Sequence, residues 1–153
     1  MQDEITIDKG AKGTYVLFIE MPQSSFIEVG ALGEIKFRRG FYAYVGSAMG
    51  GLQARLRRHL RRPKKARWHI DYLVEAGKVK GAICTLKEKR LECLLAQRLE
   101  EVFVSIGRFG SSDCHCPSHL FFSEDLETLR EKTKGIFQQI INEGELIWIW
   151  KLA

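Results

Sequence analysis

The stretch Tyr44–Leu60, with the sequence YVGSAMGGLQARLRRHL, decides the fold and the function that we expect. It begins with a Tyr-Val-Gly turn at the end of a strand and continues through a short glycine-rich connection. Leu52, Leu56 and Leu60 then recur every four residues, which predicts a helix from Gly51 to Arg62 with one apolar face. On the polar face, Arg55 and His59 are expected one turn apart, and Arg58 and Arg62 share that face.

The segment from Ser47 to Ile70 contains no Asp or Glu. It carries eight basic residues: Arg55, Arg57, Arg58, Arg61, Arg62, Lys64, Lys65 and Arg67. The remaining 16 basic residues are outnumbered by the 19 acidic ones, so the net charge of +5 arises from this segment. A local excess of cations is typical of a surface that binds phosphate, although a solvated helix face is the simpler alternative. We therefore expect a nucleic acid, or another polyanion, as the partner.

The rest of the chain predicts an α/β (α+β) domain with a mainly antiparallel central sheet and flanking helices. The chain of 153 residues, 45% of them hydrophobic, suits one compact domain over 1–153. The expected strands are 13–21, 26–29, 33–38, 40–45, 79–86 and 146–150, and the further expected helices are 68–76, 91–102 and 124–143.

The cellular location follows from what the sequence lacks. No apolar run reaches the ~20 residues that a membrane span needs, so no membrane association is expected. The first residues, MQDEITIDKG, are acidic and do not resemble a signal peptide. We expect a cytoplasmic protein with reduced thiols, in which Cys84 and Cys93 are core residues.

Two tyrosine-containing triplets, followed by an arginine and a glutamate on later helices, carry a resemblance to a known family. The triplets are Gly13-Thr14-Tyr15 and Tyr44-Val45-Gly46, and they are followed by Arg55 and then Glu92. This ordered set, from Gly13 to about Glu101, resembles the GIY-YIG nuclease superfamily. The segment 110–121 is similar to that of its small, standalone Uri-type branch.

The resemblance implies a role for each matching residue. Tyr44 is expected as the general base and Tyr15 as the residue that positions water or phosphate. Arg55 would hold the transition-state oxygens, and Glu92 would hold one divalent ion, Mg²⁺ or Mn²⁺. His59 is expected to contact phosphate or to relay the proton, with a structural role as the alternative.

One departure from the family pattern concerns the residue after the second triplet. Many relatives carry a lysine there, whereas this chain has Ser47. A cation at that position would lower the pKa of Tyr44. Lys64, Lys65 or Arg58 could substitute for it.

The segment Cys114-His115-Cys116-Pro117-Ser118-His119 offers ligands that zinc accepts. The usual structural site has two ligand pairs, and the chain shows no second pair. Cys84 or Cys93 could complete a set with Cys114, Cys116 and His119 only if the fold brings them close. A tight loop in which Ser111, Ser112 and His119 contact phosphate or substrate is therefore expected in preference to a zinc site, and a purely structural turn is the further alternative.

Two nucleic-acid functions remain open at this point, beside a third, a zinc-binding interaction protein centred on the loop with Cys114, Cys116 and His119. The first is a divalent-metal-dependent endonuclease that hydrolyses DNA phosphodiester bonds, with RNA as an alternative substrate. It would recognise DNA structure, in repair or recombination, with a protein partner possible for targeting. The second is a non-catalytic nucleic-acid-binding module on the same fold. In either case the expected contacts are Arg58, Arg61, Arg62, Lys64, Lys65, Arg67, Ser112 and His119.

Overall fold

The computed structural model describes residues 7–61, 65–87, 90–111, 114–141 and 147–151. In chain order the elements are β1 (Gly13–Met21), β2 (Ser25–Glu28), η1 (Gly30–Leu32), β3 (Glu34–Phe37), β4 (Gly40–Ala48), α1 (Leu52–Leu60), α2 (His69–Ala76), β5 (Lys78–Thr85), α3 (Glu92–Glu100), β6 (Val104–Ser105), β7 (Leu120–Ser123), α4 (Leu126–Ile140) and β8 (Ile147–Lys151). The expected α+β fold is confirmed. The strands β6 and β7 were not predicted.

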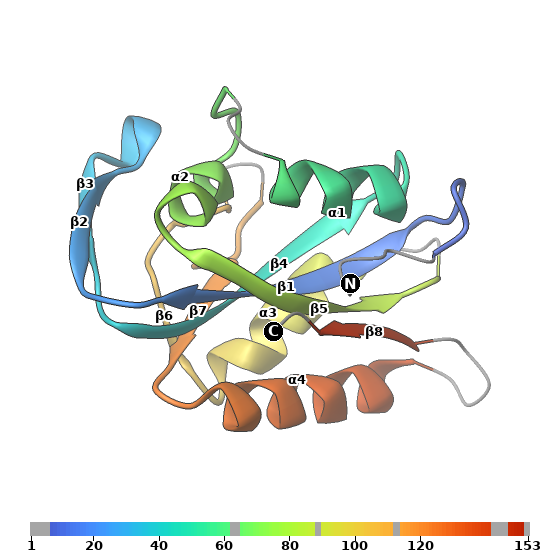
Figure 1. Cartoon of the computed structure of the whole chain (residues 1–153). Helices are drawn as coiled ribbons and strands as arrows, with labels where there is room; N and C mark the ends of the chain where they lie inside the picture. Colours follow the sequence, from blue (N-terminus) through green and yellow to red (C-terminus); the bar gives the residue numbers. More distant parts are fainter. Residues whose placement is uncertain (1–6, 62–64, 88–89, 112–113, 142–146, 152–153) are drawn as a thin grey trace.

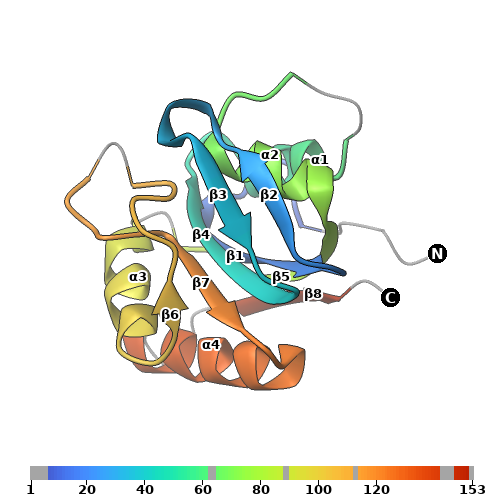
Figure 2. The same ribbon diagram turned by 90° about the vertical axis from the view of Figure 1, so that its left-hand side faces the viewer.

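The central sheet has six antiparallel strands in the order β6-β7-β4-β1-β5-β8, and β2 and β3 form a separate hairpin. Helices α1 and α2 cover one face of the sheet, while α3 and α4 cover the other (Figure 1). The hairpin projects beyond the sheet beside α2 (Figure 2). Within the described residues, none of the helices has both the length and the apolar character needed to cross a bilayer.

Strand β1 lies in the middle of the sheet and contributes side chains to two hydrophobic cores, one on each face of the sheet. Successive side chains of a strand point to opposite faces. Leu17 and Ile19 therefore pack under α1 and α2, whereas Val16 and Phe18 pack against α3 and α4. Burial on both faces explains why β1 reads as a nearly continuous apolar run.

Gly46 allows β1 and β4 to pair where the two tyrosine triplets meet. Tyr15 is the register partner of Gly46. A Cβ atom at position 46 would lie 2.6 Å from the ring and hydroxyl of Tyr15. Glycine is therefore required there, and the two triplets form one packed unit.

Candidate functional site

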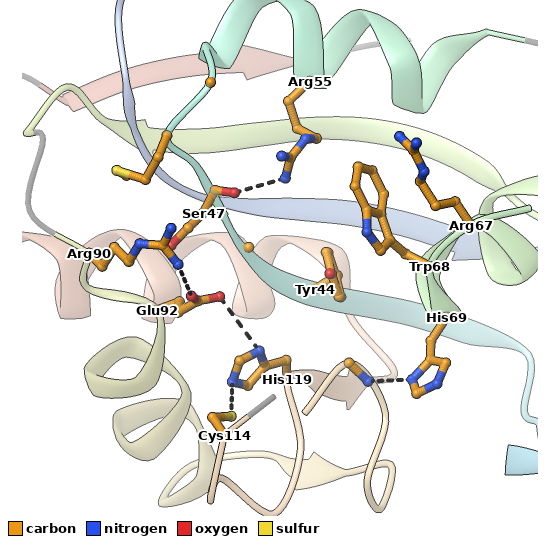
Figure 3. A pocket seen from close by; sticks show the side chains of 14 residues that line it. Tyr44, Ser47, Arg55, Arg67, Trp68, His69, Arg90, Glu92, Cys114 and His119 are labelled. Carbon is orange, nitrogen blue, oxygen red and sulfur yellow. Dashed lines mark hydrogen bonds and ion pairs between the residues drawn. The ribbon is translucent and has the colours of Figure 1, made fainter. Parts of the chain in front are cut away.

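A cleft of about 490 Å³ opens at the end of the sheet where β1 begins and β4 ends. Its walls come from five separate parts of the chain: β4, α1, the start of α2, the start of α3, and the loop that precedes β7. Figure 3 shows Tyr44, Arg55 and Glu92 lining this cleft. Three residues that are distant in the sequence are therefore brought together in one cleft.

Tyr44 forms one wall of the cleft and is partly buried. Its ring packs edge-on against Phe109, with centroids 6.4 Å apart. Gly110 lies close against it, because a Cβ there would approach the Tyr44 ring to 3.0 Å. Burial, together with the nearby Tyr15 and Glu92, raises the pKa of Tyr44 well above its usual value, and Arg55 offsets this only in part.

Arg55 extends from α1 into the cleft and is fixed on two sides. Its Nη1 donates a hydrogen bond to the backbone carbonyl of Ser47 at 2.8 Å. Its guanidinium also stacks over the ring of Trp68, 4.5 Å from the centroid. The planar group is thereby oriented before any ligand arrives, and its permanent charge suits a phosphate oxygen.

Glu92 is the first residue of α3, and its side chain is 25% exposed. Thr14 fixes this helix end, because its buried Oγ1 accepts a hydrogen bond from the backbone N–H of Leu91 at 3.0 Å. The Glu92 carboxylate lies 3.9 Å from both Arg90 and His119. One carboxylate open to the cleft suits a divalent ion that completes its coordination with water.

Tyr15 and His59 lie beneath the cleft rather than in it. Both side chains are buried, and the Tyr15 hydroxyl is 2.8 Å from Nε2 of His59. The expectation that His59 lies on the polar face of α1 is wrong, because it shares the buried face with Leu52 and Leu56. Burial also raises the pKa of Tyr15, with Arg55 opposing this in part. Of the two roles expected for His59, this position fits the structural partner.

Arg58 does not project freely from the basic surface as expected. It makes two hydrogen bonds to the buried carboxylate of Asp71, at 2.7 and 2.9 Å, and its side chain is 13% exposed. The same carboxylate accepts the backbone N–H groups of Arg67 and Trp68. Burial would raise the pKa of Asp71, but the bonds from Arg58 and from the two backbone groups hold it below its usual value. Arg58 and Asp71 therefore lock α1 to the start of α2.

The remaining cations differ in their relation to the cleft. Arg67 lines it, whereas Lys65 and Arg61 are exposed nearby in the sequence. Arg62, Lys64 and Ser112 lie outside the described residues. Ser111 is buried.

Arg90 and Trp68 are among the cleft residues that were not predicted from the sequence. Arg90 precedes α3 by two residues and is an exposed cation on the Glu92 side of the cleft. It lines the cleft together with Ser47. Trp68 directly follows the run of basic residues, and its ring stacks with Arg55 and Arg58. An aromatic residue next to several arginines is the sequence feature from which this stacking could have been predicted.

His119 lies at the back of the cleft and is buried. Its Nδ1 faces Glu92, and its Nε2 lies 3.4 Å from Sγ of Cys114. Burial lowers the pKa of His119, although Glu92 opposes this shift. His119 thus faces Glu92 with Nδ1 and Cys114 with Nε2 (Figure 3).

The expectation that Cys93 is a core residue is wrong, whereas Cys84 is fully buried in the core. Cys93 is partly exposed and lies with Cys114, Cys116 and His119, with one potential ligand atom of each residue within 4.8 Å of the others. Within the described ranges, this is the group of three or more His, Cys, Asp or Glu residues that could hold a metal. The ligand set that the sequence left incomplete is therefore completed by the fold.

One sequence family matches this chain. The model of a family described as "Domain of unknown function DUF123" matches residues 14–142, which run from β1 to just beyond α4. No curated protein and no solved structure matches the chain.

Proposed function

The chain belongs to the DUF123 family, and we propose that it is a divalent-metal-dependent endonuclease that hydrolyses phosphodiester bonds in DNA. The observation that carries the proposal is the convergence of Tyr44, Arg55 and Glu92 on one cleft. These are the residue types that the resemblance to GIY-YIG nucleases calls for, and they come from β4, α1 and α3. The proposed location is the cytoplasm, where nucleic acid is accessible.

Binding of the substrate is assigned to the cations of the cleft. Arg55 is oriented by Ser47 and Trp68, so its forked donors can hold two oxygens of the scissile phosphate. Arg67 and Arg90 line the cleft on either side and would contact neighbouring phosphates. Since phosphate contacts carry no base information, this arrangement favours recognition of DNA structure over sequence.

Hydrolysis requires a water molecule held in line with the phosphorus atom and a stabilised transition state. Tyr44 would orient that water and, once its own phenolic proton has been lost to solvent, would accept the proton of the water as a phenolate. Glu92 would hold one Mg²⁺ or Mn²⁺ ion, whose charge lowers the pKa of groups beside it and stabilises the developing negative charge. Arg55 would hold the transition-state oxygens from the α1 side.

The raised pKa of Tyr44 favours a second candidate, a nucleic-acid-binding module without turnover. In the protein alone Tyr44 is a neutral phenol, because burial opposes its ionisation more than Arg55 assists it. A neutral phenol donates a hydrogen bond but is a poor base at neutral pH. Catalysis therefore requires the added positive charge at Glu92, and without it the same cleft would bind DNA only.

Cleavage of labelled single-stranded, duplex, flap and branched DNA tests the proposal, with Mg²⁺, Mn²⁺ or EDTA in each reaction. We expect metal-dependent cleavage by the unchanged protein and none by Glu92→Ala. Glu101→Ala, an exposed position at the other end of α3, is the matched control and should cleave normally. Salt-sensitive binding without cleavage in any metal would establish the binding module and overturn the nuclease.

The Tyr44→Phe variant separates the two functions on one protein. Loss of the hydroxyl should lower cleavage by about 10²-fold or more, the lower end of what proton transfer contributes, while the Kd for DNA changes little. Tyr72→Phe, a partly buried tyrosine of α2, is its control. Equal loss of binding and cleavage in Tyr44→Phe would contradict a role in the chemical step.

A further inference from the structure

We propose that Cys93, Cys114, Cys116 and His119 form a structural zinc site that fastens the loop before β7 to the start of α3. Cys93 is the second residue of α3, and the other three residues belong to the loop. Their potential ligand atoms lie within 4.8 Å of one another. The proposal concerns a site distinct from the divalent ion proposed at Glu92 and does not depend on nuclease activity.

The spacing of the four side chains is close to what zinc requires. With Zn–S bonds of about 2.3 Å, two sulfur ligands of a tetrahedral site lie about 3.8 Å apart, and a sulfur and a nitrogen slightly less. Cys114 Sγ and His119 Nε2 are already 3.4 Å apart. A contraction of about 1 Å at the widest pair would bring all four to a shared zinc ion.

The chemistry of this set selects the ion. Three thiolates and one imidazole are soft or borderline ligands, which zinc prefers, whereas Mg²⁺ and Ca²⁺ prefer oxygen. Four protein ligands leave no position for water or substrate, so the zinc would be structural rather than catalytic.

The site would stabilise a loop that has little regular structure of its own. Between β6 and β7 the described chain is held by a few backbone contacts, such as His119 N–H to the Phe109 carbonyl at 2.8 Å. The same loop supplies Gly110 and His119 to the cleft. Zinc would therefore fix one wall of the cleft to the helix that carries Glu92.

His119 would link the two sites as a positioning residue. A metal on Nε2 places the ring proton on Nδ1, and a ligating histidine usually gives that proton to a carboxylate or carbonyl. Here Nδ1 faces the Glu92 carboxylate at 3.9 Å. Zinc would thus hold the Glu92 side chain toward the cleft through the imidazole ring.

Metal analysis of the full-length protein tests the proposal. After purification under reducing conditions and dialysis against excess EDTA, the protein is reloaded with Zn²⁺, and unbound ion is removed. We expect close to one zinc per chain, and with Co²⁺ the visible absorption of a tetrahedral cobalt–thiolate centre. Zinc below about a tenth of an equivalent would overturn the site. So would a disulfide among these cysteines that persists under the reducing conditions of purification.

Variants assign the ligands. Cys93→Ser and Cys116→Ser should lose the cobalt–thiolate band or weaken zinc binding by at least about 10-fold, while Cys84→Ala, which lies outside the cluster, should keep a full equivalent. Because a ligand variant can fail to fold, circular dichroism is recorded for each. The spectrum of the cobalt-loaded unchanged protein tests the site without any variant. In His119→Cys a fourth thiolate should retain zinc but remove the link to Glu92. A His119→Ala variant that keeps a full equivalent of zinc and an unchanged cobalt spectrum would remove His119 from the ligand set.

Discussion

Thr14 and Leu91 join the second residue of β1 to the start of α3. The buried Oγ1 of Thr14 accepts the backbone N–H of Leu91 at 3.0 Å. The first N–H groups of a helix have no partner within the helix, so an external acceptor is needed where they are buried. The central residue of the first triplet therefore sets the position of Glu92, although it lies outside the cleft itself.

Thr14→Val tests this connection. Valine keeps the shape but removes the acceptor, so the free energy of unfolding should fall by about 1–3 kcal/mol, the usual cost of an unsatisfied buried donor. Affinity for Mg²⁺ or Mn²⁺ should weaken by about 10-fold, as for other residues that orient a metal ligand. Urea unfolding and metal titration measure the two effects. Thr14→Ser keeps the hydroxyl oxygen and should retain both the stability and the metal affinity of the unchanged protein. A loss of either in Thr14→Ser would mean that the methyl group of Thr14 matters instead.

Tyr15→Phe tests the buried pair beneath the cleft. Removing the hydroxyl that lies 2.8 Å from His59 Nε2 should lower the free energy of unfolding by about 1–3 kcal/mol. Thermal unfolding measures the loss, and Tyr72→Phe on α2 is the control. A variant of unchanged stability that has lost cleavage would instead mean that Tyr15 acts on the substrate directly.

Asp71 predicts a dependence of stability on pH. Its pKa is lowered in the folded protein, so the folded state favours the ionised carboxylate more strongly than the unfolded chain does. This stabilisation is complete above the unfolded pKa of about 4, and it is lost as the pH falls through the lower folded pKa. The urea midpoint of the unchanged protein should therefore fall more steeply below about pH 4 than that of Asp71→Asn.

Asp71→Asn should also be less stable at pH 7. The substitution leaves Arg58 partly buried without its carboxylate, and breaking such a pair by removing one partner costs about 3–5 kcal/mol when both groups are buried. Because Arg58 is 13% exposed, a loss at or below the lower end of that range is expected. Chemical denaturation at pH 7 measures it, and a loss below about 1 kcal/mol would show that Arg58 finds water or another acceptor.

The basic segment predicts how DNA binding responds to salt. The double variant Lys65→Glu and Arg67→Glu should weaken binding and reduce the slope of log K against log salt by about 0.9 for each phosphate that the protein no longer neutralises. Lys132→Glu combined with Lys134→Glu on α4 removes the same charge elsewhere. Fluorescence anisotropy at several salt concentrations compares them. Equal effects of the two double variants would mean that net charge, not the cleft, attracts DNA.

The regular elements were predictable because their patterns are local. The β1 strand matches its predicted range of 13–21, and α1 and α2 start within one residue of the predicted positions. The last helix was predicted to begin at position 124, and α4 begins at Leu126, after Asp125, whose side chain accepts the Thr128 N–H as an N-cap. These elements depend on the spacing of apolar residues and on helix-capping residues. Both features can be recognised within a short stretch of sequence.

The missed features depend on contacts between distant segments. The β6 strand has two residues, and β7 becomes a strand by pairing with β4, so neither has a strong pattern of its own. His59 was assigned to the polar face from its spacing of one helical turn from Arg55, whereas the side chain is buried and its Nε2 pairs with the Tyr15 hydroxyl. The approach of Cys93 to the loop cysteines follows from how α3 packs, which spacing along the chain does not contain.

The close contact between Gly46 and Tyr15 has a consequence for the evolution of this family. Any side chain at position 46 would collide with the aromatic ring opposite, at 2.6 Å. A lineage could then replace the glycine only after, or together with, a smaller residue at position 15. Positions 15 and 46 should therefore covary among relatives, so that a change at one is accompanied by a change at the other.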